Sequence, residues 1–356
     1  MQISEQQLQT IKYSMLSEPG DALAHLIFET FGSEIAERIS HPATRRTLQE
    51  YLHSFYPEQL GNLQGLIERF ELRQKSIDLQ QTIEKAIRWG ARPVFFEQLP
   101  TLSAKFADLG NHAPYVLWVA GDVDVLEAEF VGVVGTREPS AKGLNQTSKL
   151  VRLLNSPVVS GGAKGIDAAA HRTALDQGLP TVAFMAGGID RAYPLDNWSL
   201  FHEMVRAGGA LVSELAPGTA PSRFRFLQRN RLIAASSREL YVVQAAYRSG
   251  SKNTANAARM LGREVFAVPG AWSDRASQGT NAMIQEGLAK PFQLGKEILF
   301  EDSSVRRRVL DAMRDGKRGV EEIAAESGLT VSEVLVELNQ VQRERLPIPD
   351  PMFIRS

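Results

Sequence analysis

The stretch PVVSGGAKGIDAAAHRTAL, residues 157–175, decides the fold class. A short β-branched run ends in a glycine-rich turn, and an alanine-rich segment of helical character follows. Glycine lets the backbone approach a ligand closely, and the free N–H groups at the start of a helix attract anions. The order therefore predicts a strand, a phosphate-binding turn and a helix, the repeating unit of a nucleotide-type α/β fold.

Further strands of the same kind surround this stretch. Short apolar runs alternate with helix-length segments, at residues 131–134, 157–160, 181–185, 210–214, 240–245 and 264–268. This alternation predicts an extended Rossmann-like, doubly wound and mostly parallel sheet. Ligands bind to such sheets at the carboxyl ends of the strands, so the loops at that edge are the candidate site.

The segments before and after the predicted sheet have different residue patterns. Apolar residues at three- and four-residue spacing predict a small helical domain at residues 1–88. Turn signals interrupt the pattern from Pro93 onward and predict a connecting region that packs on the strands that follow. This region and the strands together form the predicted α/β domain, residues 89–300. Three short helices in 301–356, at 305–313, 320–329 and 330–342, have the spacing of a winged-helix unit.

Composition restricts the class of protein. The chain has 356 residues, 43% of them hydrophobic, which is enough for two or three folded domains. Its 40 Lys and Arg nearly balance 41 Asp and Glu, so nucleic-acid binding would depend on locally clustered cations. Cysteine is absent, which excludes disulfides and thiolate zinc sites. The polar amino terminus and the lack of an apolar run of about 20 residues predict a cytoplasmic protein with no membrane partner.

Two glycine turns are the first candidates for anion binding. The strand at 131–134 runs into Gly135, Thr136 and Arg137, and a helix start follows, so Arg137 could bind a phosphate beside free N–H groups. An isolated turn of this kind more often serves only to reverse the chain. The second turn adds a lysine among small residues, with Ser160, Gly161, Gly162, Lys164 and Gly165. We expect both turns to line one cleft.

Two residues after the second turn have predicted structural roles. Asp167 is well placed to cap the helix that follows, by accepting backbone N–H bonds. His171 lies four residues later on the same helical face, where an Asp–His pair could act as a base. No nucleophile accompanies the pair in the sequence, so we prefer a structural hydrogen bond.

The third and fourth candidate segments bring arginine, aromatic and hydroxyl groups. Residues 222–231 hold four arginines interleaved with phenylalanines, which suits phosphates and stacked bases. The alternative is that the phenylalanines belong to the core and the arginines form a solvated face, and both interpretations stay open. The loop after the 240–245 strand opens another helix with backbone donors. The candidate binding residues are Arg225, Phe226, Arg229, Asn230, Arg231, Ser249, Gly250 and Thr254.

Motifs that are missing exclude several activities. The sequence has no GxGxxG with an acidic partner and no GxxxxGK[ST], so neither NAD binding nor P-loop ATP hydrolysis is supported. Six histidines show no zinc spacing, and we find no carboxylate cluster suited to a metal-dependent nuclease. We therefore expect no cofactor and no metal.

Eight ordered motifs resemble the DprA/Smf family of DNA-processing proteins. They are GTR (135–137), SGGAKGIDAAAH (160–171), GGIDRAYPLDN (187–197), SE (213–214), RNRLIA (229–234), RSGSKNTA (248–255), GREVFAVPG (262–270) and GTNAMIQEG (279–287). The resemblance implies a non-enzymatic, dimeric protein that binds single-stranded DNA and helps to load the recombinase RecA during natural transformation. It gives Arg137 a phosphate-binding role and implies a sterile-alpha-motif-like amino-terminal domain.

The chain departs from the family pattern at three places. Thr136 stands where the family usually has serine, which keeps a hydroxyl group. FLQRNR (226–231) stands where FPxRNR is usual, and the lost proline is expected to loosen that loop. Gln244 replaces a commonly acidic residue and is expected to alter a hydrogen bond at the sheet end.

Two competing functions come from other classes of protein. A nucleotide phosphoribohydrolase of the lysine-decarboxylase-like group would use a similar sheet, but its PGGxGTxxE motif is matched only by GGID (187–190) and GTNA (279–282), without the glutamate. A winged-helix regulator would bind duplex DNA through residues 320–342. Both rank below single-strand binding.

Overall fold

The computed structural model describes residues 3–292, apart from Ala192 and Arg248, together with residues 309, 312–313, 317, 319–331, 334–335 and 338. The chain divides into two compact units, Met1–Phe292 and Gln293–Ser356. In the second unit, α15 (Val320–Ser327) agrees with one predicted helix. Most of the predicted helices at 305–313 and 330–342 lie outside the described residues, so the winged-helix assignment stays a prediction.

The first unit joins a helical amino-terminal part to an α/β part. Its α-helices are α1 (Glu5–Leu16), α2 (Ala22–Phe31), α3 (Pro42–Phe55), α4 (Leu63–Gln74), α5 (Leu79–Arg88), α6 (Pro100–Ala107), α7 (Ala141–Leu154), α8 (Ile166–Asp176), α9 (Trp198–Arg206), α10 (Arg223–Ser236), α11 (Gly250–Met260) and α12 (Gln278–Gln285). Its strands are β1 (Ala91–Val94), β2 (Leu117–Gly121), β3 (Phe130–Val134), β4 (Val158–Ser160), β5 (Thr181–Phe184), β6 (Ala210–Ser213), β7 (Ser237–Val242), β8 (Glu264–Ala267) and β9 (Lys290–Pro291). Helices and strands thus alternate from β3 to β9.

One sheet holds these strands in the order β1-β2-β6-β5-β4-β3-β7-β8-β9. All neighbours from β6 to β9 pair in parallel, whereas β1 and β2 pair antiparallel with each other and β2 pairs antiparallel with β6. From β3 the chain first builds outward through β4, β5 and β6, and then returns to add β7 on the other side. The carboxyl ends of β3 and β7 therefore form a topological switch point, where such sheets bind ligands.

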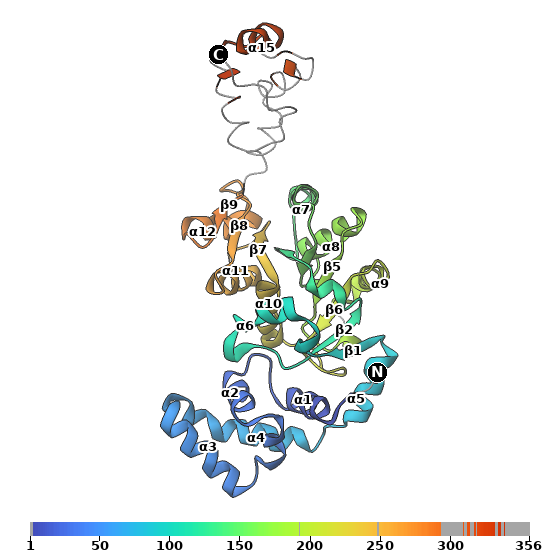
Figure 1. Cartoon of the computed structure of the whole chain (residues 1–356), viewed down its shortest axis with the longest axis vertical. Helices are drawn as coiled ribbons and strands as arrows, with labels where there is room; N and C mark the ends of the chain where they lie inside the picture. The colour runs from blue at the N-terminus through green and yellow to red at the C-terminus, as the bar shows by residue number, and fades with distance from the viewer. Residues whose placement is uncertain are drawn as a thin grey trace. The chain divides into compact units, whose positions relative to one another are not determined.

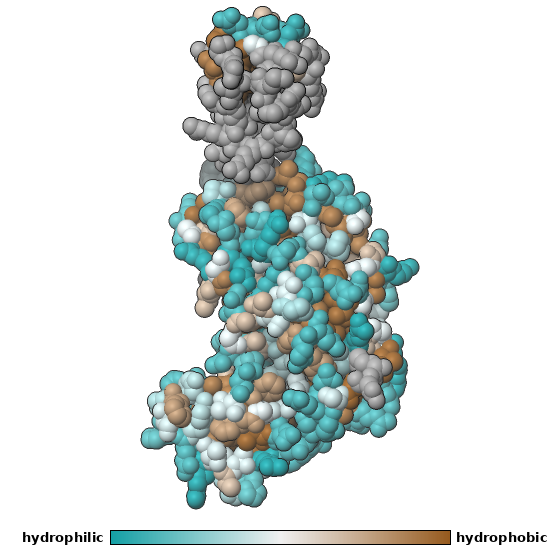
Figure 2. All heavy atoms as spheres, in the orientation of Figure 1, coloured by the Kyte–Doolittle hydropathy of each residue, from teal (hydrophilic) through white to brown (hydrophobic). Residues whose placement is uncertain are grey.

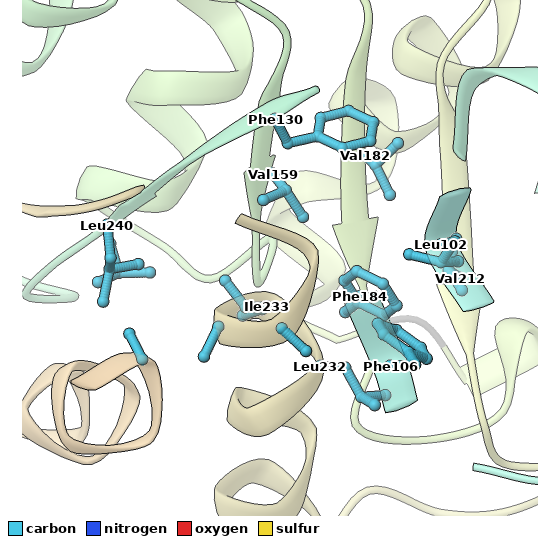
Figure 3. Close-up of a cluster of buried hydrophobic side chains, with 14 of the residues drawn as sticks. Leu102, Phe106, Phe130, Val159, Val182, Phe184, Val212, Leu232, Ile233 and Leu240 are labelled. Carbon is cyan, nitrogen blue, oxygen red and sulfur yellow. The ribbon is translucent and has the colours of Figure 1, made fainter. Parts of the chain in front are cut away.

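Helices cover both faces of the sheet (Figure 1). On β3, Val131 and Val133 join one core cluster with residues of α7 and α8, while Phe130 and Val134 join the cluster on the opposite face. Side chains alternate between the faces of a strand, so β3 is buried from both sides. Figure 3 shows the second cluster, in which Leu232 and Ile233 of α10 lie against side chains of the central strands.

The six strands predicted from the sequence are confirmed, and so is the mostly parallel sheet. The region between Pro93 and Phe130 was expected only to connect and pack, which is wrong, because β1 and β2 extend the sheet there. The strands were missed because Pro93 in β1 and Gly121 at the end of β2 are residues typical of turns. β1 lies at the edge of the sheet, where a strand tolerates proline.

The amino-terminal helices have a core of their own. Tyr13, Leu16 and Phe70 are fully buried there, and Tyr115 from the α/β part packs against the cluster. On the face that Figure 2 presents, hydrophilic side chains predominate over the first unit and hydrophobic ones form scattered patches. Within the described residues, no helix combines the length and apolar character that crossing a bilayer requires.

Candidate nucleic-acid interface

A cleft of about 730 Å³ opens at the switch point of the sheet. The turn after β3 forms one wall with Gly135, Thr136, Arg137 and Glu138, and the loop after β7 with the start of α11 forms another. Ala163 and Asp167 contribute from the second glycine turn, and α10 closes the remaining side. The first and fourth segments predicted from sequence reach this cleft with all the residues expected, whereas the third does so without Arg225 and Arg231. The second glycine turn reaches it only through Ala163 and Asp167.

The two glycine turns are fastened to each other. The N–H of Ile166 donates to the carbonyl of Thr136 at 3.2 Å, and the N–H of Thr136 donates to the carbonyl of Gln244 at 2.7 Å. Gly165 has φ +82°, and a Cβ there would lie 2.4 Å from the Thr136 carbonyl. Only glycine fits this close approach, which explains the residue at that position.

Gln244 ties the loop after β7 to the start of α7. Its Oε1 accepts the N–H of Ser140 at 3.1 Å, and its Nε2 donates to the Ser140 hydroxyl at 2.9 Å. An acidic side chain could accept the first bond but could not donate the second while ionised. The hydroxyl of Ser140 also caps α7 by accepting the N–H of Gly143.

Arg137 reaches over the cleft from an exposed turn. Its guanidinium lies 5.1 Å from the ring centroid of Phe226, which belongs to α10. The Arg229 guanidinium lies 5.8 Å from the same ring, and Tyr193 meets it at 5.7 Å. Arginine stacked on an aromatic face keeps its in-plane N–H donors free for an oxygen ligand. Arg137 is therefore oriented by Phe226 while its charge stays available.

Below the cleft, Arg229 and Asp167 form a buried charged layer. The Nη1 of Arg229 donates to the carbonyls of Gly161 and Phe184, each at 2.6 Å, and thus joins the ends of β4 and β5. Burial lowers the pKa of Arg229 to about 10, which the nearby Asp167 opposes. Burial raises the pKa of Asp167, and the Arg229 charge opposes this shift. Arg229 holds the sheet ends in place more than it offers charge to a ligand.

The sequence predicted that Asp167 caps α8, but its carboxylate instead binds within the second glycine turn. Its carboxylate accepts the N–H groups of Gly161 and Ala163, which precede α8, and the N-cap position belongs to Gly165 without a side-chain bond. The prediction of a helix cap is wrong because the polypeptide curls back before α8 begins. The carboxylate is therefore committed to the shape of the second turn.

His171 has a structural hydrogen bond, but with Thr181 and not with Asp167. The Thr181 hydroxyl donates to the carbonyl of Val158, so Nδ1 of His171 must donate to that hydroxyl, at 2.7 Å. Nε2 is then unprotonated and has no partner among the described residues. Burial, with the charges of Arg229 and Arg172, lowers the pKa of His171 to about 3. The imidazole is neutral and lies away from the cleft.

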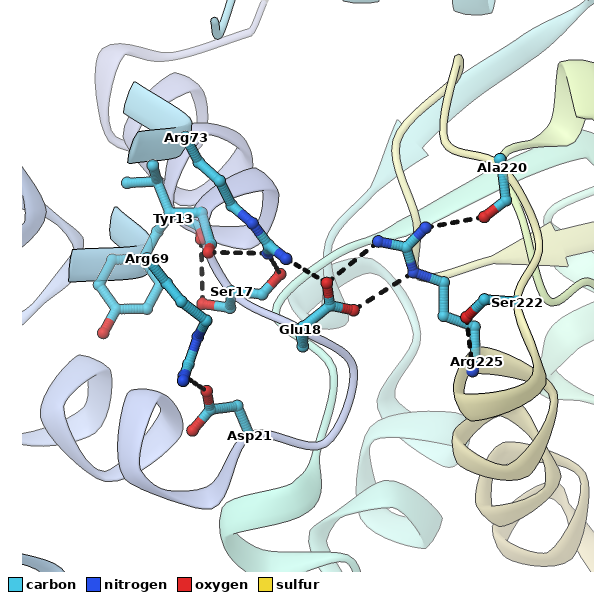
Figure 4. A network of polar contacts seen from close by, with 10 residues as sticks. Tyr13, Ser17, Glu18, Asp21, Arg69, Arg73, Ala220, Ser222 and Arg225 are labelled. Atoms are coloured by element: carbon cyan, nitrogen blue, oxygen red, sulfur yellow. Dashed lines mark hydrogen bonds and ion pairs between the residues drawn. The ribbon is translucent and has the colours of Figure 1, made fainter. Parts of the chain in front are cut away.

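Two arginines of α10 are engaged elsewhere. Arg231 forms a two-pronged ion pair with Glu214, at 2.7 and 2.6 Å, and both side chains are about nine-tenths buried. Figure 4 shows Arg225 bound to Glu18 of the amino-terminal helical part, which Arg73 also contacts. Burial alone would raise the pKa of Glu18, but bonds from the two arginines outweigh it and lower the pKa.

Helix α10 itself replaces a predicted loop. Ser222 accepts the N–H of Arg225 and caps the helix, which continues to Ser236. The segment FLQRNR therefore lies within a helix, and the expectation that its missing proline loosens a loop is wrong. Arg223 at the first turn is exposed and lines the cleft, although it was not among the predicted binding residues.

The loop after β7 supplies the opposite wall. Ser249 caps α11 by accepting the N–H of Ser251, and Asn230 of α10 donates to Asn253 at 3.1 Å. Ser251 and Asn253 line the cleft beside the predicted Ser249, Gly250 and Thr254. Both were missed, although they lie in the quoted motif RSGSKNTA. The amino end of α11 thus faces the cleft with hydroxyl and amide groups.

Seven predicted binding residues lie outside the cleft lining. Lys164 is exposed and paired with Asp196, and its hydrogen bond to that carboxylate raises its pKa. Ser160 is buried and donates to the carbonyl of Val133 at 2.6 Å. The cleft lining does not include Ser160, Gly161, Gly162, Lys164, Gly165, Arg225 or Arg231.

The cleft can bind anions, and its carboxylates are few. Arg137 and Arg223 bring charge, and the amino end of α11 brings neutral donors. Among the described residues that line the cleft, the carboxylates are Glu138 and Asp167, and Asp167 is bound to backbone. In the described part of the chain, no group of three His, Asp or Glu could hold a metal ion.

Comparisons with known proteins agree with this architecture. The family model described as DNA recombination-mediator protein A matches residues 97–302. A Mycobacterium tuberculosis DNA processing protein DprA is 39% identical over 311 residues, 78% of this chain and 79% of the relative. DprA of Streptococcus pneumoniae is 40% identical over 191 residues, 53% of this chain and 67% of the relative. An X-ray structure of DprA from that species has a TM-score of 0.62 at 30% identity, covering 85% of this chain and 99% of its own. This chain therefore belongs to the DprA/Smf family of DNA recombination-mediator proteins.

Proposed function

We propose that this protein binds single-stranded DNA in the cleft and does not cleave it. The observation that carries the proposal is Arg137, an exposed arginine stacked on Phe226 at 5.1 Å in a cleft bordered by helix amino termini. Arg137 and Arg223 bind phosphates, and Lys164 binds a phosphate just outside the cleft. The ring of Phe226 offers a contact to a base. Single-strand binders commonly combine a cationic groove with aromatic platforms.

The carboxylates favour binding over catalysis. A nucleotide phosphoribohydrolase would need an acidic residue held in the cleft and free to act on the ribose. Of the two described carboxylates in the lining, Asp167 is occupied by the N–H groups of Gly161 and Ala163, and Glu138 lies in the exposed turn after β3. His171 is fully buried and is bonded to Thr181. We accordingly propose no cofactor, no metal and no catalytic residue.

Binding should be tested by fluorescence anisotropy with labelled poly-dT and its duplex counterpart at two salt concentrations. We expect preference for the single strand and an affinity that falls with salt at a log–log slope of about −0.7 for each phosphate neutralised. The double variant Arg137→Ala with Lys164→Ala should lose this binding. Arg238→Ala is the matched control, because Arg238 is exposed at the amino end of β7, away from the cleft. Salt-insensitive binding, or none, would overturn the proposal.

We further propose that the protein acts as a homodimer that delivers DNA to RecA. The family description as a recombination mediator supports this role. RecA-dependent strand exchange should accelerate when the protein is added, and the Arg137→Ala variant should lose the effect. Sedimentation of the protein alone and with poly-dT measures the oligomeric state. A monomer in both conditions, or unchanged strand exchange, would contradict this part.

A further inference from the structure

A second hollow, of about 560 Å³, lies beside the cleft. Trp89 follows α5, Tyr193 and Leu195 lie in the loop before α9, and Trp198 begins α9. The side chains of Trp89, Tyr193 and Leu195 are 42%, 49% and 75% exposed, so large apolar faces meet solvent. We call these four residues and the adjoining Arg191 the aromatic groove.

The aromatic groove is joined to the cleft at two points. The ring of Tyr193 lies 5.7 Å from the ring of Phe226, on which Arg137 stacks. Asn197, between Leu195 and Trp198, donates through Nδ2 to the carbonyls of Gly162 and Ala163 at 2.9 and 3.1 Å. Ala163 lines the cleft, so this buried amide holds the groove loop against the cleft wall. A ligand leaving the cleft past Phe226 meets the groove next.

The groove has the chemistry of a base-stacking surface. Trp89 meets the half-buried Trp198 edge to face at 5.4 Å, and His202 also packs on Trp198 at 4.8 Å, so Trp89 is the more open of the two indole rings. Arg191 is exposed at the rim, with its Nε 3.9 Å from the Asp190 carboxylate, which is 8% exposed and also accepts the N–H of Gly218. Unstacked bases bind such rings, and a nearby cation binds the backbone between them. A purely aliphatic ligand would need no cation at the rim.

We propose that the aromatic groove continues the path of single-stranded DNA beyond the cleft. Bases that follow the segment held at Arg137 stack on Tyr193, Trp198 and Trp89, and Arg191 binds a phosphate between them. The proposal rests on the proposed function, because the cleft must hold the strand first. It assigns a nucleic-acid subsite to residues that border the amino-terminal helices.

Length dependence separates the subsite from the cleft. Trp89→Leu keeps an apolar side chain but removes the stacking ring, and it lies away from Phe226. We expect this variant to bind an oligonucleotide of about 4 nucleotides as wild type does, and one of about 16 nucleotides about tenfold more weakly, the effect of one lost stack. Arg137→Ala should weaken both lengths. Trp89→Phe keeps a ring and should retain affinity for the longer strand.

Tryptophan fluorescence supplies a direct readout, because a stacked base quenches an indole. The chain has four tryptophans, of which Trp118 is fully buried and Trp272 is 89% exposed outside the groove. Poly-dT should quench the wild type, and Trp89→Phe should lose much of the quenching while still binding. Trp272→Phe is the control and should keep the quenching.

The outcomes distinguish the two proposals. If the wild type fails to bind single strands, the proposed function falls. If the wild type binds and Arg137→Ala binds more weakly, but Trp89→Leu binds both lengths normally and Trp89→Phe keeps the quenching, only the groove proposal is overturned. Equal weakening of both lengths by Trp89→Leu also overturns it, since the ring would then support the cleft itself.

Discussion

The turn after β3 and helix α10 both bring arginines to the same cleft, and they use them differently. Arg137 in the turn is exposed and, among the described residues, contacts an aromatic face alone, while Arg225, Arg229 and Arg231 of α10 bind carboxylates or carbonyls. Arg223, at the exposed first turn of α10, binds no carboxylate or carbonyl among the described residues and resembles Arg137 in this respect. Residue type alone therefore does not identify a binding arginine, because the same guanidinium stabilises the fold wherever a buried acceptor lies within reach.

The largest effect on stability is expected at Arg231. Arg231→Ala leaves Glu214 buried without its partner, which should lower the free energy of unfolding by about 3–5 kcal/mol. Urea unfolding followed by circular dichroism measures this. Replacing both partners, Arg231→Met with Glu214→Leu, should recover most of the loss, because no buried charge remains. A fully stable Arg231→Ala protein would mean that the two arginine classes do not differ.

The burial of His171 should make the stability of the protein depend on pH. The pKa of His171 is 6.5 ordinarily and about 3 in the folded protein. Below about pH 6.5 the unfolded chain binds a proton at His171 that the folded chain does not bind. The contribution of neutral His171 to the free energy of unfolding is therefore complete above pH 6.5 and is lost as pH falls toward 3. The slope reaches about 1.4 kcal/mol per pH unit.

Urea unfolding of wild type and His171→Gln at about pH 7 and about pH 5 isolates this contribution. The difference between the two proteins should shrink or reverse at the lower pH, because the variant has no group to titrate there. Asp167, whose pKa burial raises, acts in the opposite direction in both proteins and cancels from the comparison. Parallel pH profiles would show that His171 is not held neutral.

Arg225 should have an intermediate effect. Arg225→Ala removes its pair with Glu18, but Glu18 keeps Arg73, so no carboxylate is stranded. We expect a loss of about 1 kcal/mol in unfolding free energy, typical of a partly exposed pair. A loss as large as that of Arg231→Ala would mean that this contact is as important to folding as the buried pair.

The smallest effect on stability is expected at Arg137. Arg137→Ala should change the unfolding free energy by less than about 0.5 kcal/mol, since the side chain is exposed. Its binding defect should instead reduce the log–log salt slope by about 0.7, the value for one lost phosphate contact. Arg223→Ala is the matched variant on α10 and should behave alike. A strongly destabilised Arg137→Ala protein would mean that Arg137 stabilises the fold, as the paired arginines of α10 do.

Local patterns were enough to predict the central sheet and the anion-ready edge. Strands, glycine turns and the starts of α7 and α11 depend on neighbouring residues, so spacing and residue type reveal them. The carboxyl edge as the binding edge follows from the alternation of strands and helices, whereas the switch point between β3 and β7 depends on the strand order. The turn residues Gly135 to Arg137 and the loop residues Ser249, Gly250 and Thr254 were accordingly predicted and do line the cleft.

What the sequence by itself determined is thus the fold class and the edge of the sheet where an anion can bind. Only the tertiary structure decided which cations remain available there. Glu18 is 207 residues from Arg225 in sequence, and Glu214 is 17 residues from Arg231, so neither pairing follows from local spacing. The same holds for β1 and β2, whose antiparallel pairing joins distant segments. Charge pairing and burial depend on which segments meet in space, and local residue patterns do not contain that information.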